Sequence, residues 1–113
     1  MINLAAGKCV ACRGDEPMLT EAEIEDLKFH VPEWQVRDVD GMNRLERSFK
    51  FKNFAQALEF TNKIGAIAEE EDHHPRIITE WGRVTVQWWT HKIGGLHKND
   101  FIMAAKTDEL NQA

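Results

Sequence analysis

The stretch RLERSFKFKNFAQALEF, residues 44–60, changes its hydrophobic period partway along. In its first half Leu45, Phe49 and Phe51 alternate with polar residues, which is the period of two typical of a half-buried strand. After Asn53, a residue type favoured as a helix N-cap, the apolar spacing becomes that of a helix. The helical face continues through Phe54, Ala57, Leu58, Thr61, Gly65 and Ala68. The stretch therefore predicts a strand that leads directly into an amphipathic helix.

A hairpin and a short helix are predicted before this stretch. Asp40-Gly41 is a strong signal for a two-residue turn, so the strand from Leu45 to Phe51 should pair with an earlier one that contains Trp34 and Val36. Further toward the N-terminus, Thr20 and Glu23 have the spacing of a capping box. That pattern predicts a helix from about 21 to 29.

A second hairpin and a last helix follow. Pro75 should end the long helix by about residue 73, because the residue before a proline avoids the α region. Ile77 and Val86 belong to strands on either side of a turn near Trp81-Gly82. The segment HKNDFIMAAKTDEL, residues 97–110, is expected to be helical. The order α-β-β-α-β-β-α predicts a two-layer α+β domain, with a four-stranded antiparallel sheet and three helices packed on one face.

Length and composition are those of one soluble domain. A chain of 113 residues with 42% hydrophobic residues can bury a real core. Its net charge of −5 argues against nucleic-acid binding, and its apolar runs fall short of the roughly 20 residues of a membrane span. The first residues lack the basic start of a signal peptide, so a cytoplasmic protein is expected. We expect residues 1–19 to form an irregular arm and residues 20–113 to form the single domain.

Adjacent histidines, His73 and His74, follow an acidic run where the long helix meets the second hairpin. Imidazole can donate or accept a proton near neutral pH, so an acid/base site is one interpretation and a solvated helix end is the other. His91 follows the last strand. Asp100 falls in the first turn of the last helix, where it either compensates the helix dipole or joins a pocket. If these segments converge, the histidines form a compact acid/base pocket.

A metal site is the weaker interpretation. Ligand pairs on a helix sit at i and i+4, whereas His73 and His74 are adjacent. Cys9 and Cys12 form one CxxC, which is half of a zinc knuckle. A composite site of these cysteines with two histidines stays open, while a redox role lacks the usual strand-to-helix setting. We expect no metal.

The chain has four tryptophans and no tyrosine, which is an unusual choice of aromatic residues. One of Trp88 and Trp89 should lie in the core, because neighbouring strand residues point to opposite faces. Trp34 and Trp81 are candidates for stacking on a flat heteroaromatic ligand, although burial alone would explain either.

Three motifs together resemble the signature of the pterin-4a-carbinolamine dehydratases. They are E-x3-HHP from Glu69 to Pro75, the hairpin residue Trp81, and TH-x3-GL-x3-D from Thr90 to Asp100. The resemblance covers about residues 18–110 and includes the tryptophan of PEWQV. The segment KCVACRGDEP resembles the N-terminal extension of bacterial members. In eukaryotes the family doubles as the dimerization cofactor of a homeodomain transcription factor.

The resemblance implies a reaction and a set of site residues. The reaction is loss of water from 4a-hydroxytetrahydrobiopterin to give quinonoid dihydropterin, with no cofactor, in the pterin recycling that follows the aromatic amino-acid hydroxylases. His73 is the expected principal acid/base, while His74 and His91 bind the pterin or exchange the second proton. The implied set comprises catalytic His73, His74 and His91, acidic Glu69 and Asp100, and substrate-binding Trp34, Asp72, Pro75, Trp81 and Thr90.

Partners and alternatives follow from the same resemblance. It implies a homodimer formed by edge strands or a homotetramer formed by helices, with an aromatic amino-acid hydroxylase as pathway partner. One alternative is a pterin-binding or transcription-coactivator dimerization module whose catalysis is incidental. Another is a dehydratase for a different pterin, for example in molybdopterin metabolism. The chain departs from the family pattern at Lys92, Ile93 and Asn99, which bears on substrate contacts or on a partner surface.

Overall fold

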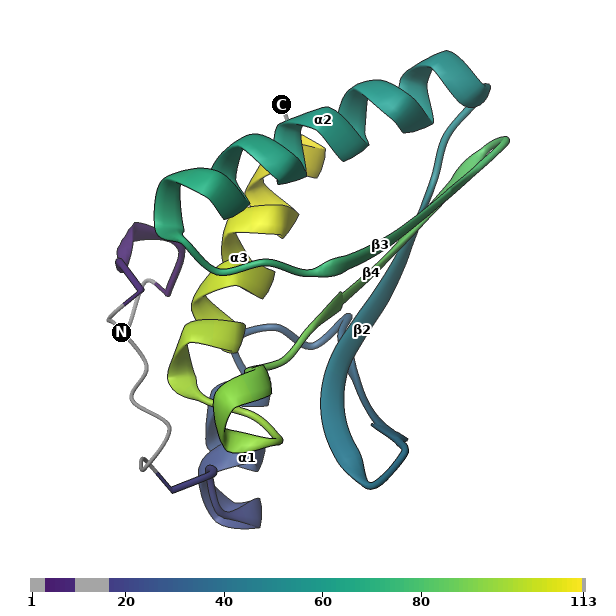
Figure 1. Ribbon diagram of the computed structural model, residues 1–113. Coiled ribbons are helices and arrows are strands. Elements are labelled where there is room, and N and C mark those ends of the chain that lie inside the picture. Colours follow the sequence, from purple (N-terminus) through teal and green to yellow (C-terminus); the bar gives the residue numbers. More distant parts are fainter. Residues whose placement is uncertain (1–3, 10–16, 113) are drawn as a thin grey trace.

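The computed structural model describes residues 4–9 and 17–112, which form an antiparallel sheet with helices on one side (Figure 1). Its elements in chain order are η1 (Leu4–Ala6), α1 (Glu21–Lys28), β1 (Gln35–Val39), β2 (Met42–Lys50), α2 (Phe54–Glu71), β3 (Arg76–Glu80), β4 (Arg83–Trp88), η2 (His91–Ile93) and α3 (Lys98–Gln112). The four strands lie in the order β1-β2-β4-β3. The predicted α+β class and the order α-β-β-α-β-β-α are confirmed.

Turn residues set both hairpins. Asp40 and Gly41 have φ values of 54° and 81°, and a type I′ turn requires such positive values at both central positions. The Asp38 carboxylate accepts the Gly41 N–H at 2.9 Å, which fixes the turn further. In the second hairpin Gly82 takes a φ of 76°. The turns therefore lie where the sequence predicted them.

Two side-chain caps decide where α1 and α2 begin. The Thr20 hydroxyl accepts the Glu23 N–H at 3.2 Å, and the Glu23 carboxylate accepts the Thr20 N–H at 2.9 Å. Asn53 accepts the Gln56 N–H at 2.8 Å and so caps α2. The predicted starts of α1 and α2 are confirmed.

The core lies between the sheet and the two long helices, α2 and α3 (Figure 1). Its largest fully buried apolar side chains are Trp34, Trp88, Phe101, Leu45 and Ile64. α1 packs against α3 at one end of this layer. Among the residues described, no helix has the length and apolar character needed to cross a membrane.

Residues 4–9 are also packed onto the domain. Leu4 of η1 is only 4% exposed and belongs to the core, and η1 lies beside α3 (Figure 1). The Lys106 ammonium of α3 donates to the Ala5 carbonyl at 2.9 Å. Residues 4–9 thus lie against α3.

Candidate active site

The way α2 ends determines the direction of the first histidine. Asp72 takes the left-handed conformation, with φ 51° and ψ 44°. The Asp72 N–H then donates to the Glu69 carbonyl at 3.4 Å, and the His73 N–H donates to the Ala68 carbonyl at 3.1 Å. These two bonds form a Schellman motif, which reverses the chain at the helix terminus. Pro75 follows and keeps the segment from resuming the helix.

His73 turns inward and meets a buried carboxylate. Its Nε2 lies 2.6 Å from Asp100 Oδ1, although the two residues are 27 positions apart in the chain. The Asp100 side chain is fully buried and that of His73 is 12% exposed. The imidazole also stacks on the Trp88 ring, with centroids 5.7 Å apart and planes 12° apart. A carboxylate at Nε2 favours the tautomer that carries its proton there, and leaves Nδ1 as the nitrogen that can exchange a proton with a ligand.

The second carboxylate oxygen of Asp100 accepts hydrogen bonds at the start of α3. Oδ2 accepts the Thr90 hydroxyl and the His97 N–H, both at 2.9 Å. In return, His97 Nδ1 accepts the Asn99 N–H at 3.0 Å. Asp100 therefore lies at the terminus of α3 and contacts His73 at the same time. His97 was not singled out from the sequence, although the spacing His97-x2-Asp100 resembles a capping box in which histidine replaces the hydroxyl residue.

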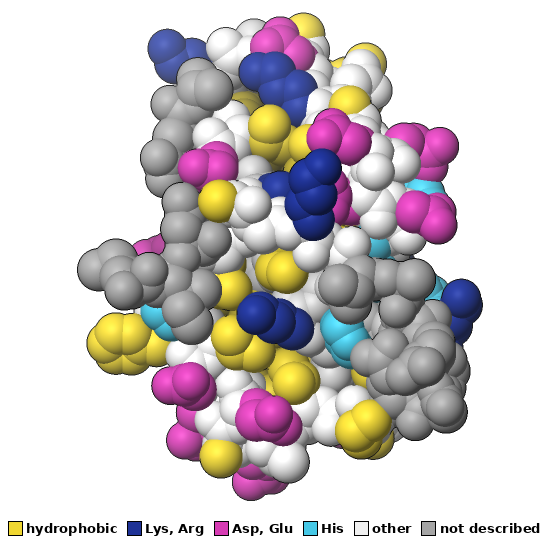
Figure 2. All heavy atoms as spheres, turned by 90° about the vertical axis from the view of Figure 1, so that its left-hand side faces the viewer, with side chains coloured by type: hydrophobic (Ala, Val, Ile, Leu, Met, Phe, Trp, Pro, Cys, Tyr) yellow, Lys and Arg dark blue, Asp and Glu magenta, His cyan; other side chains and the backbone are white. Residues whose placement is uncertain are grey.

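His74 and His91, the other two candidate histidines, are exposed. His74 is paired through Nε2 with the Glu69 carboxylate at the surface. His91 follows Thr90, the residue that holds Asp100, and its ring lies 4.4 Å from that of Trp89. The guanidinium of Arg44 covers Trp89 at 3.8 Å. In Figure 2 several histidine side chains lie toward the right-hand side of this face, one of them between acidic side chains.

The two tryptophans considered for stacking on a ligand lie in the core and at a turn. Trp34 is fully buried, where its N–H donates to Asp108 at 2.8 Å and its ring meets Phe49 edge-on. A ring buried in this way presents no face to a ligand. Trp81 is 73% exposed at the tip of the second hairpin, the far end of β3 from His74. Seven strand residues span on the order of 20 Å. Burial and turn position thus account for both.

Trp88 and Trp89 are both buried, although only one was expected in the core. Trp88 faces α3, where its N–H donates to Thr107 at 3.1 Å. Trp89 is 5% exposed on the opposite side of the sheet, under Arg44. Arg44 in turn donates to Gln87 at 3.1 Å. The sequence could indicate that Trp88 and Trp89 point to opposite faces, but not that Arg44, bonded to Gln87, covers Trp89.

Comparison with known proteins shows the family of the chain. A family model described as pterin 4 alpha carbinolamine dehydratase matches residues 17–110. The chain belongs to this family. Relatives named for pterin-4-alpha-carbinolamine dehydratase in Marinobacter nauticus and Nitrosococcus oceani are 61% and 59% identical over 110 residues. These alignments cover 97% of this chain, and 99% and 97% of the two relatives.

One solved structure agrees with membership of the dehydratase family, and a second shares the fold. The crystal structure of a transcriptional coactivator/pterin dehydratase from Brucella melitensis is 36% identical, with a TM-score of 0.74 over 82% of this chain and 97% of that one. A pterin dehydratase-like RuBisCO assembly factor of the alpha-carboxysome is 23% identical, with a TM-score of 0.58 over 69% and 88%. The second likeness shows the fold alone.

In this dehydratase-family chain, Trp34 gives a test that separates core from site. Trp34→Phe removes the N–H bond to Asp108, a carboxylate that is also paired with Arg47 at 2.6 Å. Burial raises the pKa of Asp108, and the bonds from Trp34 and Arg47 oppose that rise. We expect the variant to lose about 1–3 kcal/mol of unfolding free energy, because a half-buried carboxylate loses one of its two hydrogen-bond donors. Denaturant unfolding measures this, and an unchanged stability with a raised KM would move Trp34 into the site.

The thiol of Cys9 is protected rather than reactive. Burial, and then the negative charges of Glu71 and Asp100, raise the pKa of Cys9 from 9.0 to about 12. The thiol is therefore protonated at neutral pH, and the thiolate is the form that attacks or binds metals. The described residues contain no cluster of three or more histidine, cysteine or acidic side chains that could hold a metal ion. Cys12 lies outside the described residues.

The serine variant of both cysteines is expected to keep its activity. Cys9→Ser with Cys12→Ser should leave turnover within a few fold, since the protonated thiol of Cys9 supplies no nucleophile and we expect the reaction to require no atom of either side chain. Steady-state kinetics and metal analysis of the purified proteins measure this. Stoichiometric zinc in the wild type, lost together with activity in the double variant, would contradict the prediction.

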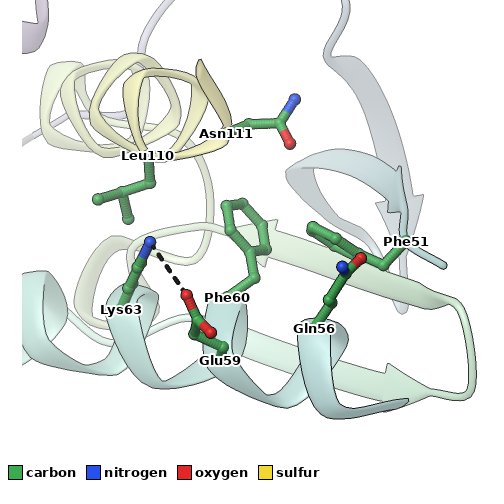
Figure 3. Close-up of a pocket in the computed structure, with 7 residues that line it drawn as sticks. All are labelled: Phe51, Gln56, Glu59, Phe60, Lys63, Leu110 and Asn111. Atoms are coloured by element: carbon green, nitrogen blue, oxygen red, sulfur yellow. Dashed lines mark ion pairs between the residues drawn. The ribbon is translucent and has the colours of Figure 1, made fainter. Parts of the chain in front are cut away.

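One described cavity lies away from the histidines. It has a volume of about 260 Å³ and opens between the first half of α2 and the end of α3 (Figure 3). Its lining residues are Phe51, Gln56, Glu59, Phe60, Lys63, Leu110 and Asn111. The volume falls below the range of about 300–1,000 Å³ typical of ligand pockets. The cavity is also at the opposite end of α2 from His73.

Proposed function

We propose that this chain dehydrates a pterin 4a-carbinolamine, with His73 as the principal proton-transfer group. The observation that carries the proposal is the 2.6 Å contact of His73 with the fully buried Asp100, in a member of this dehydratase family. In the reaction the C4a–O bond breaks and the hydroxyl leaves as water. The N5 proton is lost and a C4a=N5 double bond forms. Both steps are proton transfers that an imidazole can assist near neutral pH.

The histidines divide this work according to their surroundings. The carboxylate of Asp100 accepts a hydrogen bond from the Nε2–H of His73 and stabilises the imidazolium that forms when Nδ1 takes a proton. We assign pterin binding chiefly to the exposed His91, since its ring is braced by Trp89. His74, paired with Glu69, is assigned to the second proton transfer.

The proposed substrate is 4a-hydroxytetrahydrobiopterin, and the product is quinonoid dihydropterin. The step then follows an aromatic amino-acid hydroxylase and returns the pterin to use, in the cytoplasm. A homodimer or homotetramer is proposed with it. β1 and β3 are the outer strands of the described sheet, and an exposed strand edge is suited to pairing with another copy.

A second function is supported by the Brucella melitensis neighbour, whose name includes transcriptional coactivator. In that case the domain is an interaction module and its catalysis is incidental. A dehydratase for another pterin is the remaining variant of the main proposal. An interaction module does not require an imidazole held on a buried carboxylate, which is why dehydration is preferred.

The direct test is decay of a freshly formed 4a-carbinolamine with and without the protein. The decay rate should rise above the spontaneous rate in proportion to protein concentration. The Asn53→Ala variant is a matched control, because it loses a helix cap at the other end of α2 and keeps every histidine. A decay rate that stays at the spontaneous value with folded protein would remove the proposal.

A further inference from the structure

Cys9 lies between the two segments that carry the His73–Asp100 contact. Its backbone N–H donates to Glu71 Oε1 at 2.8 Å, and its thiol lies 3.8 Å from the Asn99 carbonyl. Glu71 is the last residue of α2, two positions before His73, and Asn99 directly precedes Asp100. Cys9 therefore contacts a residue close in sequence to His73 and a residue next to Asp100.

The segment that presents Cys9 is itself fixed to α3. Leu4 is buried in the core, and the Lys106 ammonium donates to the Ala5 carbonyl at 2.9 Å. At Gly7 a Cβ atom would lie 3.4 Å from the Ile102 side chain, so the backbone passes close to α3 there. The packing of this segment on α3, the helix that carries Asp100, thus fixes the position of the Cys9 N–H that binds Glu71.

The His73–Asp100 contact depends on two helix ends, and helix ends open more readily than helix centres. On the α2 side, only the left-handed residue Asp72 separates Glu71 from His73. A catalytic contact must be held to a fraction of an ångström by groups around it. We propose that Glu71 is a positioning residue. Its bond to the Cys9 N–H ties the end of α2, through residues 4–9, to α3 and keeps His73 against Asp100.

This inference rests on the proposed function, and its test uses three variants of the full chain. Glu71→Ala removes the acceptor of the Cys9 N–H, whereas Glu71→Gln keeps an oxygen in its place. Glu70→Ala is the matched control, because Glu70 is an exposed neighbour on the same helix end. For each variant, kcat, KM and the exchange rate of the His73 Nε2 proton, observed by nuclear magnetic resonance, are measured.

Glu71→Ala should lower kcat about 10-fold with KM little changed, less than the 10²-fold that a 1 Å misplacement can cost. Its His73 Nε2 proton should exchange faster than in the wild type. Glu71→Gln and Glu70→Ala should stay close to the wild type in both measurements. If the wild type proves to have no dehydratase activity, the proposed function fails. The proton exchange rate alone then tests whether the bond from Cys9 to Glu71 holds His73 against Asp100. A folded Glu71→Ala protein whose exchange rate equals that of the wild type would overturn the inference.

Discussion

His73→Ala is expected to lower kcat for carbinolamine dehydration by about 10²–10⁴-fold, the usual contribution of a positioned acid or base. Asp100 holds the imidazole at Nε2 and Trp88 stacks on its face. A neighbouring side chain without these contacts cannot take over its role. Stopped-flow measurement of carbinolamine decay gives the rate. The fold should survive, because the substitution removes a ring at the edge of the core and leaves the helix-ending bond of the His73 backbone intact.

His91→Ala is the matched comparison for this prediction. His91 is exposed and is assigned to binding, so its loss should mostly raise KM, where lost uniform binding appears. Circular dichroism and thermal melts check that both variants are folded. A folded His73→Ala protein that turns over as fast as the wild type would show that the pair with Asp100 is a helix-end contact only.

Asp100→Asn is expected to lower kcat about 10- to 150-fold, which is the range for loss of a hydrogen bond to a charged group, about 1.5–3 kcal/mol. Asp100 accepts from His73 on one oxygen and from Thr90 and His97 on the other. Asparagine has one acceptor oxygen only. If that oxygen keeps the bonds from Thr90 and His97, the amide NH₂ faces His73 and requires the opposite imidazole tautomer.

The nitrogen chemical shifts of His73 report its tautomer directly, and they should change in Asp100→Asn. The variant should also lose some stability, so Asn53→Ala is its control. Loss of the α2 cap costs about 1 kcal/mol without touching the histidines, and kcat should be unchanged. An Asp100→Asn protein that loses only stability, with normal kcat and an unchanged His73 spectrum, would reduce Asp100 to a helix cap.

Local patterns in the sequence were sufficient for most of the fold. The Asp40-Gly41 turn, the capping box at Thr20 and the cap at Asn53 each depend on residues close in sequence. Their chemistry could therefore be predicted without tertiary information. The end of α2 was predicted from Pro75, whereas the residue that reverses the chain is Asp72, and a left-handed aspartate has only a weak sequence signal.

The site was less predictable because its main contact joins distant residues. His73 and Asp100 were both candidates, but their 27-residue separation is closed only by the packing of α2 against α3. The same limit applies to Trp34, whose ring N–H donates to Asp108 in α3, and to Cys9, whose neighbours are Glu71 and Asn99. Residue type marked these positions, and tertiary packing decided what each one does.

The most direct test of the central claim, that His73 and Asp100 act as one proton-transfer unit, is a double-mutant cycle in kcat. The single variants His73→Ala and Asp100→Asn are compared with the protein that carries both. If the carboxylate acts through the imidazole, Asp100→Asn should lower kcat about 10- to 150-fold in the wild type and have almost no further effect once His73 is alanine. Equal fold losses in both backgrounds, so that the two effects multiply, would contradict the account.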